Sequence, residues 1–429
     1  MFGFANFLLL ALFAAAVFDL IFALARGDGL RGALHGLLNT PHLLFGQQLA
    51  EWRLQLGRIL FAAGLAAYEI SVVFCNSMAR QNWAWVQGVM SPVLEWLAFL
   101  CFGAKILFGT RYTWRELLAG GALYFIARWV YFNSQNIWWI GIVVAVLAAK
   151  DVPLRRPLQV YFASGCAAMA VVLALHFAGI VAPDLTSERM GALRGTYGYG
   201  HPNTFGGLVF GLVLAYALLR AQKVRWVDCL LVFAVGVFLL VGPASRSAAL
   251  CTLALAVGLV FCCLRAGHSV PRWWPGTCAG MVGLTAAVSY LLPLLVIKVG
   301  PWNNDIGPAW LAKLDSLLTC RISLTWMAYR LLDVKIAGQV FNWPTVDNSF
   351  AFALFQFGPV VAALLGILFA AALLGHAKQG RRVEVCCLFA MLAYAYMEVQ
   401  PFHLTTNPTA LLLCGAVFAQ TSARWQKIE

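Results

Sequence analysis

The chain has 429 residues, of which 62% are hydrophobic and only 11% are charged. A soluble globular domain is typically about 45–50% apolar and about 25% charged, so this chain has too few polar side chains to cover a water-facing surface. These proportions exclude a soluble domain and predict an integral membrane protein. The formal net charge of +13 would suit nucleic acid, but the placement of the basic residues argues against that partner.

Apolar runs of membrane-spanning length recur from the N-terminus to the C-terminus. About 20 apolar residues cross roughly 30 Å of hydrocarbon as a helix. The predicted spans, about 13 in number with a range of about 12–14, are Asn6–Leu24, Gly57–Cys75, Val89–Phe108, Leu117–Tyr131, Ile137–Ala149, Leu158–Ile180, Thr204–Leu219, Trp226–Val241, Ser247–Leu264, Met281–Val296, Ser349–Leu374, Val385–Val399 and Thr409–Phe418. We therefore expect an all-α, polytopic membrane bundle that forms one transmembrane domain over residues 1–429.

The N-terminal region leaves two points to settle. The first run, Asn6–Leu24, lacks a basic segment before it and is too long for a cleavable signal peptide, so we expect a retained span. The stretch His35–Leu49 is either an interfacial segment or a further short span.

The basic residues fall mainly on one side of the predicted bundle. About two-thirds of the 30 lysines and arginines lie in or near the N-terminal loops, the C-terminus and the loops at residues 105–115, 150–156, 220–225, 265–272 and 376–382. Because cytoplasmic loops carry an excess of Lys and Arg, this side is predicted to be cytoplasmic. The net charge is then a topology signal with some attraction to anionic membrane lipid, and no nucleic-acid partner is expected.

Two loops on the opposite, external side are long. One is Val181–Asn203, and the other is Lys298–Asp347, which is too apolar for a disordered linker. In the second loop, Trp310–Leu318 and Ile322–Leu332 carry apolar residues at helical spacing, which predicts short amphipathic helices on the outer surface. A long, partly helical loop between spans favours a binding surface.

The first polar cluster lies in the first of these loops, where the chain enters a span. It holds Arg194, His201 and Asn203 among glycines at 195, 198 and 200 that permit close backbone approach. Pro202 precedes the helix, and Asn203 lies where an N-cap is expected. A helix N-terminus beside an arginine is a natural anion site. The alternative is a glycine-rich turn with a structural arginine and histidine.

Two further clusters lie on the same membrane face. Arg246 stands in a tight external turn, where it either extends to lipid headgroups or binds an anion such as phosphate with its planar guanidinium. Arg321 begins the second external helix, and Asp347 and Asn348 precede the next span. Asp347 is either an N-cap or a general base near the arginines.

Together, the three arginines and Asp347 suit a reaction that releases a diphosphate. Arginines neutralise the leaving anion, and the carboxylate takes a proton from an attacking hydroxyl. The sequence has no Asp-x-Asp pair and no Cys or His spacing of a metal site, so neither a metal nor another cofactor is expected. Nearby arginines and a helix N-terminus are expected to lower the pKa of Asp347, which leaves His201 as the alternative base.

Four motifs in order carry a family resemblance. They are an arginine followed by GYGHPNTFG, then SRS, then RISLTW beginning at Arg321, and then VDNSFAFALFQFG. This order over about residues 180–410 resembles the bacterial O-antigen polymerase and O-antigen ligase superfamily, and the GHPN and DN-aromatic forms are closer to the Wzy-type polysaccharide polymerases. Residues 1–150 are similar only as generic spans.

The resemblance implies a fold of the GT-C type and a metal-independent, inverting glycosyl transfer from undecaprenyl-diphosphate-linked glycans. It places the chain in the bacterial cytoplasmic membrane with its active site on the extracytoplasmic face, with a flippase and a chain-length regulator as candidate partner proteins. Arg194 and Arg246 match arginines implicated in diphosphate binding. Asp347 falls where ligases carry a catalytic histidine, which favours a polymerase, and Glu398 resembles a late acidic position of polymerases or is a helix-packing carboxyl.

Two other functions stay open at this point. A ligase of the same superfamily would transfer a finished glycan to a lipid, cell-wall or protein acceptor. A transporter or flippase of lipid-linked sugar would have charged residues near the membrane midplane. Asp19, Glu69, Glu95 and Arg128 lie within predicted spans and are compatible with it.

Overall fold

The structure is a computed structural model that describes residues 32, 42–43, 51–181, 187–189, 192–296 and 308–418. The predicted span Asn6–Leu24 lies outside these residues, as does the stretch His35–Leu49 except for two of its residues. In the described part, strands are confined to two short antiparallel pairs: β1 (His42–Leu43) with β2 (Arg111–Tyr112), and β3 (Ser187–Arg189) with β4 (Ala192–Arg194).

Helices make up almost all of the remaining described structure. Their bounds are α3 Glu51–Cys75, α4 Ala79–Asn82, η1 Val86–Met90, α5 Ser91–Phe108, α6 Trp114–Ser134, α7 Ile137–Ala148, α8 Arg155–Phe177, α9 Pro202–Arg220, α10 Trp226–Val241, α11 Arg246–Leu264, α12 Trp274–Leu291, η2 Leu292–Leu295, α13 Ala309–Leu317, α14 Arg321–Leu331, α15 Ser349–Phe352, η3 Ala353–Phe357, α16 Pro359–Lys378, α17 Arg382–Met397, η4 Gln400–Phe402, η5 Pro408–Leu413 and α18 Cys414–Val417.

Seven helical segments in the described ranges are long and apolar enough to cross a membrane. They are Glu51–Cys75, Val86–Phe108, Arg155–Phe177, Pro202–Arg220, Arg246–Leu264, Trp274–Leu295 and Pro359–Lys378, and three shorter apolar helices are Ile137–Ala148, Trp226–Val241 and Pro408–Val417. The prediction of a polytopic helical membrane protein is therefore confirmed in its general form. Every predicted span within the described residues corresponds to one helix or to a run of consecutive helices.

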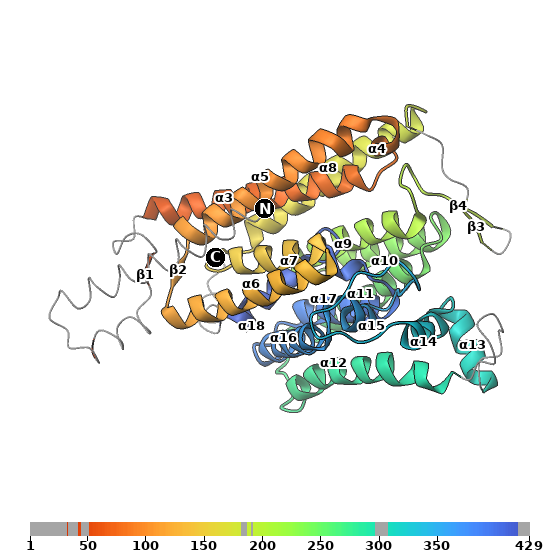
Figure 1. The fold of residues 1–429 in the computed structure, drawn as a ribbon. Helices are drawn as coiled ribbons and strands as arrows, with labels where there is room; N and C mark the ends of the chain where they lie inside the picture. Colours follow the sequence, from red (N-terminus) through yellow and green to blue (C-terminus); the bar gives the residue numbers. More distant parts are fainter. Residues whose placement is uncertain are drawn as a thin grey trace.

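The helices pack against one another in a few extensive pairs. Helix α3 packs against α5 and α8, α10 against α11, α11 against α17, and α12 against α16 (Figure 1). The closest approach in the first group joins Gly57 of α3 to Gly109 after α5, where a Cβ on Gly57 would lie 2.8 Å from the Cα of Gly109. Large apolar side chains such as Val227 and Leu230 are about 70% exposed, as expected for a surface that faces lipid.

One predicted span is wrong in detail. The stretch Ser349–Leu374 was expected to be continuous, but it is divided into α15, the π-helical turn η3 and α16. The division falls at Gly358, whose φ of 88° lies in the left-handed region, and at Pro359, which has no N–H to continue the helix. The chain near Ile336 approaches the break so closely that a Cβ on Gly358 would lie 2.1 Å from the Ile336 carbonyl oxygen. The short helix α15 is thereby free to point differently from α16.

Both predicted helices of the second long loop are present. Helices α13 and α14 begin and end within one residue of the predicted bounds, whereas residues 298–307 of that loop lie outside the described part. The buried Asp315 joins the two helices, since its Oδ1 accepts the backbone N–H groups of Ile322 at 2.8 Å and Ser323 at 3.1 Å. The first turn of α14 is buried, so this helix is inserted at its N-terminus and does not lie flat on the surface.

The predicted sidedness can be tested with a natural cysteine. Cys320, between α13 and α14, is exposed, and Gln222 is an exposed residue after the opposite end of α9. We expect a membrane-impermeant maleimide added to intact cells, after permeabilisation of any outer membrane, to label Cys320, and the Cys320→Ser variant to lose that signal. A Gln222→Cys substitution made in the Cys320→Ser background should be labelled only after the cytoplasmic membrane is permeabilised. Labelling of both positions from outside would contradict the topology.

Candidate functional site

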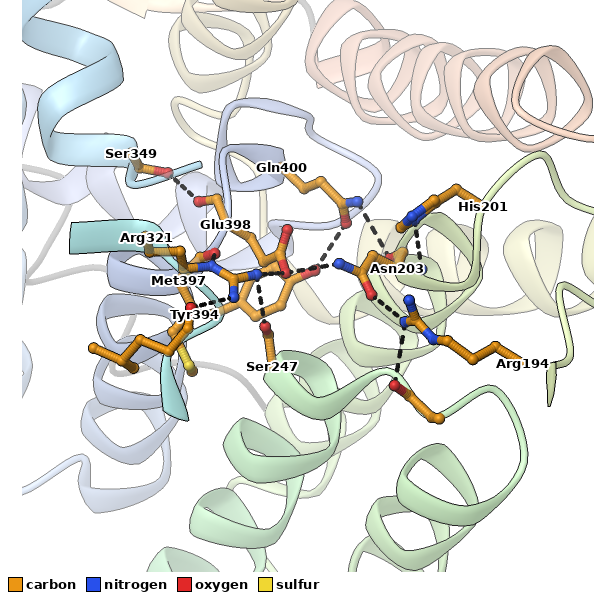
Figure 2. Close-up of polar contacts among 12 residues, drawn as sticks. Arg194, His201, Asn203, Ser247, Arg321, Ser349, Tyr394, Met397, Glu398 and Gln400 are labelled. Atoms are coloured by element: carbon orange, nitrogen blue, oxygen red, sulfur yellow. Dashed lines mark hydrogen bonds and ion pairs between the residues drawn. The ribbon is translucent and has the colours of Figure 1, made fainter. Parts of the chain in front are cut away.

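A chain of buried polar contacts joins four segments that are far apart in the sequence (Figure 2). It runs through Arg194 at the end of β4, Asn203 in the first turn of α9, Glu398 after α17 and Arg321 at the start of α14. The starts of α9, α11 and α14 therefore meet the end of α17 at one place.

The centre of this chain is the ion pair between Arg321 and Glu398. Arg321 Nη2 donates to Glu398 Oε1 at 2.6 Å, and the two side chains are 8% and 6% exposed. Three further acceptors surround the guanidinium: Ser247 Oγ at 3.2 Å from Nη2, the Leu318 carbonyl at 2.9 Å from Nη1, and the Met397 carbonyl, which accepts from Nε. A guanidinium has five N–H groups, so these four acceptors occupy most of its donors. Few N–H groups of Arg321 remain for a ligand, so its main role here is to hold Glu398 in place.

Asn203 connects this pair to the second buried arginine. Its Nδ2 donates to Glu398 Oε1 at 3.1 Å, and its Oδ1 accepts from Arg194 Nη2 at 2.9 Å. Arg194 also donates to the Ala244 carbonyl at 3.2 Å, in the turn before α11. One carboxyl oxygen therefore accepts from both Arg321 and Asn203, and a second positive charge lies one amide group away.

The predicted N-cap of α9 is wrong by two residues. His201 has the extended backbone of an N-cap, and its Nδ1 accepts the backbone N–H of Asn203 at 3.1 Å. Pro202 at the first helical position explains this placement, because a proline there needs no hydrogen-bond partner for its nitrogen. The side chain of Asn203 is thereby released from capping and serves the polar chain.

The same contact limits His201 as a base. A neutral imidazole has one nitrogen lone pair that can accept a proton, and in His201 that lone pair, at Nδ1, already accepts a backbone N–H. Protonation there would remove the cap from α9. The ring is exposed.

Asp347 and Asn348 have different positions in the next turn. Asn348 is the N-cap of α15: its Oδ1 accepts from the N–H groups of Phe350 at 2.9 Å and Ala351 at 3.1 Å, and its Nδ2 donates to Ser289 Oγ at 3.1 Å. Because Asn348 caps α15, the alternative that Asp347 is the N-cap is wrong.

Asp347 is half-buried and lies within the electrostatic range of Arg321 and His201. Burial raises the pKa of the Asp347 carboxyl above its ordinary value, and the two neighbouring groups oppose this only in part. The expectation of a lowered pKa is therefore wrong, because loss of hydration outweighs the opposing effect of the neighbouring groups on the pKa of Asp347. A raised pKa makes the carboxylate a stronger base than an exposed aspartate.

Arg246 stands at the edge of the polar chain. It is exposed and is the first residue of α11, next to Ser247, whose hydroxyl accepts from Arg321. The free N–H groups of a helix start and the guanidinium lie close together here, which is an arrangement that attracts anions.

Several polar residues of the site were not singled out from the sequence. Gln400 donates to the Asn203 carbonyl at 3.2 Å and accepts from Tyr394 at 2.8 Å, while Ser349 donates to the Glu398 carbonyl at 2.5 Å. Ser247 and Ser349 belong to the SRS and DNS motifs, so the motifs contained a signal for them. The sequence around Tyr394 and Gln400 contained none, because their role depends on the turn that follows α17.

Burial also raises the pKa of the Glu398 carboxyl, although Arg321 opposes the shift. Glu398 lies after the last residue of α17, at the end of the bundle where the site is. In the parts of the chain that the structure describes, no three His, Cys, Asp or Glu side chains are grouped as metal ligands would be.

A narrow apolar cleft adjoins the polar site. It runs between α12, α15, α16 and α17, and its lining includes Tyr290, Ser349, Gly366, Phe369 and Ala395. Ser349 belongs to both places, because it is one of the residues that line the cleft and its hydroxyl donates to the backbone carbonyl of Glu398. The polar site and the apolar cleft thus share Ser349.

No protein-family model matches the chain, and the searches of curated proteins and of solved structures found no match either.

Removal of Arg321 should leave a buried, uncompensated carboxylate. We expect Arg321→Met to lower the free energy of unfolding by about 3–5 kcal/mol, measured by denaturation of the detergent-purified protein. Without the guanidinium the pKa of Glu398 should rise further. The folded state of the variant then binds a proton on Glu398 more tightly than the unfolded chain does. The decrease in the free energy of unfolding is therefore greatest at neutral pH and becomes smaller as the pH falls through the folded-state pKa of Glu398.

The matched control is Arg330→Met, on the exposed face of the same helix, where Arg330 lies 5.9 Å from the centre of the Trp326 ring. This substitution should lower the free energy of unfolding by less than about 1 kcal/mol, and the decrease should not depend on pH. Equal losses in the two variants would show that the ion pair has no special role in stability.

Proposed function

We propose that the chain is a membrane glycosyltransferase that polymerises undecaprenyl-diphosphate-linked oligosaccharide repeat units on the extracytoplasmic face of the bacterial cytoplasmic membrane. The observation that carries the proposal is the buried chain Arg194–Asn203–Glu398–Arg321 beside the start of α11 and Asp347. The resemblance of the motifs to the O-antigen polymerase and ligase superfamily supports the same reaction class and a GT-C-like arrangement.

The donor diphosphate would bind between Arg194 and Arg246. Arg194 is held by Asn203 and by the Ala244 carbonyl, and Arg246 follows in the first turn of α11. The starts of α9 and α11 add the positive ends of two helix dipoles. Guanidinium groups and backbone N–H groups together neutralise charge that develops on a leaving phosphate, which lowers the barrier without a metal ion.

The chemical step is a single displacement at the anomeric carbon of the donor sugar. The acceptor hydroxyl forms the new C–O bond as the bond to the phosphate oxygen breaks, and the electron pair leaves with the lipid diphosphate. The hydroxyl proton passes to the carboxylate of Asp347, whose pKa is raised by burial. One displacement inverts the anomeric configuration.

The apolar cleft would take the first part of the isoprenoid chain. The residues of α12 and α16 that line it are hydrophobic, and Ser349 of the same lining donates to the backbone carbonyl of Glu398 in the polar site. A lipid diphosphate has the same order of groups, with an apolar chain joined directly to two phosphates. This match is the second support for a lipid-linked donor.

Two alternative functions remain open. A ligase of the same superfamily would use the same donor site with a different acceptor. A transporter of lipid-linked sugar is favoured by one observation: Glu69 is 2% exposed within α3, and its Oε2 has no hydrogen-bond partner among the described residues. Carboxyl groups inside a membrane span often mark transport pathways.

Asp347 can be tested against His201 as the proton acceptor. We expect Asp347→Asn to retain donor binding and to reduce product formation by about 100- to 10,000-fold, the usual contribution of a general base. His201→Gln should keep part of the activity. In the wild type the ring lone pair of His201 accepts a backbone N–H at the start of α9, so His201 is not the proposed proton acceptor. In the wild type, the rate should fall in acid with a midpoint above the ordinary aspartate range and be level at higher pH. Normal product from Asp347→Asn with an inactive His201→Gln would assign the base to His201.

The cleft can be tested by filling it. A Cβ on Gly366 meets no atom within 4 Å, so Gly366→Phe can place a ring in the cleft. Since each displaced CH₂ group forfeits about 0.8 kcal/mol, we expect at least a roughly tenfold loss of kcat/KM with a long-chain donor and little change with a short-chain donor. Gly283→Phe, on the exposed side of α12 with equally open space, is the control. Equal loss for both donors would remove the cleft from the proposal.

A further inference from the structure

A second charged region lies at the opposite end of the bundle from the candidate site. Helices α9 and α11 begin at the site and end in this region, and α17 begins here and ends beside Glu398. Since α9 has 19 residues, its two ends are about 28 Å apart at 1.5 Å per residue. The region is therefore separate from the Arg321–Glu398 pair.

The region contains a cleft of about 750 Å³. Three segments line it: residues 221–226, residues 262–263 with 266–267, and residues 380–384. We call it the basic cleft, because Lys223, Arg225, Arg381 and Arg382 line it and Glu384 is the one acidic residue of its lining. A cleft with this excess of positive charge concentrates anions.

The positive charges of the basic cleft are mostly uncompensated. Arg382 donates to the backbone carbonyls of Arg265 and His268, so it holds the loop after α11 without meeting a carboxylate. Glu384 acts electrostatically on Arg381. Lys223 and Arg225 are exposed and take part in no ion pair with another residue that the structure describes.

Asp228, an acidic residue outside the lining, already has its own partners. Asp228 accepts from Arg220 Nε at 3.1 Å, from Tyr216 at 2.5 Å and from the backbone N–H of Arg225 at 2.7 Å. The Asp228 carboxylate therefore pairs with Arg220 and accepts a hydrogen bond at the start of α10. Lys223 and the Arg225 guanidinium remain available to a bound anion.

Exposed apolar side chains continue directly from the charged rim. Trp226, Val227 and Leu230 follow Arg225 on α10 and are 58%, 71% and 68% exposed, and Leu264 at the end of α11 is 62% exposed. An ion that is fully soluble in water gains nothing from this surface, whereas a lipid has an acyl chain to lay along it. Tryptophan at such a position is typical of the boundary between headgroups and hydrocarbon.

We propose that the basic cleft is a binding site for an anionic phospholipid, with its phosphate between Lys223, Arg225 and Arg381 and its acyl chains along the exposed face of α10. The site does not depend on the glycosyltransferase proposal, because it requires only charge and membrane contact. The bound lipid would join the loop after α9 to the start of α17, two of the helices that reach the candidate site.

The test uses the full chain purified in a neutral detergent. Native mass spectrometry would measure binding of phosphatidylglycerol, which has one net negative charge, and of phosphatidylcholine, which has none. We expect wild-type protein to retain phosphatidylglycerol preferentially. The double variant Lys223→Gln/Arg225→Gln should bind it about 30-fold more weakly, since each basic residue near a lipid surface contributes about fivefold in affinity.

The control is Arg272→Gln/Lys378→Gln, which removes the same charge from exposed residues outside the lining. It should bind phosphatidylglycerol like the wild type. Equal weakening in both double variants would show diffuse attraction to a basic surface and overturn the site. Displacement of the lipid by inorganic pyrophosphate at comparable concentration would also overturn it and assign the cleft to a soluble anion.

Discussion

The buried charge of Glu398 is the constraint on which the arrangement of the site depends. A carboxylate removed from water is costly unless it is paired and hydrogen-bonded, and Arg321 and Asn203 both donate to one of its oxygens. These partners lie on α14 and α9, while Ser247 on α11 accepts from the same guanidinium. Each helix must keep its position relative to the others for the charge to be satisfied, so one ion pair fixes the meeting point of four helices.

Two other local features make this meeting possible. Asp315 satisfies the first N–H groups of α14 and so allows the start of that helix to be buried with Arg321. The break at Gly358 and Pro359 separates α15 from α16 and lets Asn348 cap a short helix whose first residue, Ser349, contacts Glu398. Asp347 precedes that cap and is left half-buried with a raised pKa. A rigid polar centre thus stands beside a single carboxylate that is not used in capping.

The sequence predicted elements better than it predicted contacts. Apolar runs located the helices, and helical spacing located α13 and α14 within one residue, because hydrophobic periodicity is a local property. Four of the residues singled out from the sequence, Arg194, Asn203, Arg321 and Glu398, share one polar network, but the sequence did not predict the contacts between them. The break in Ser349–Leu374 was not predicted although Gly358–Pro359 signals it, because the apolar residues on both sides are typical of one continuous span. The pairing of Arg321 with Glu398 joins residues 77 positions apart, and the pKa of Asp347 depends on burial; no single-sequence pattern contains either.

The most direct measurement uses the full chain reconstituted in vesicles with an undecaprenyl-diphosphate-linked oligosaccharide repeat unit. Products would be separated by size, and released lipid diphosphate would be counted against new glycosidic bonds. The proposal predicts a ladder of products that differ by one repeat unit, with one lipid diphosphate released for each bond formed and no requirement for an added metal ion. Movement of the lipid-linked substrate across the vesicle membrane without any new glycosidic bond would contradict it and identify a transporter.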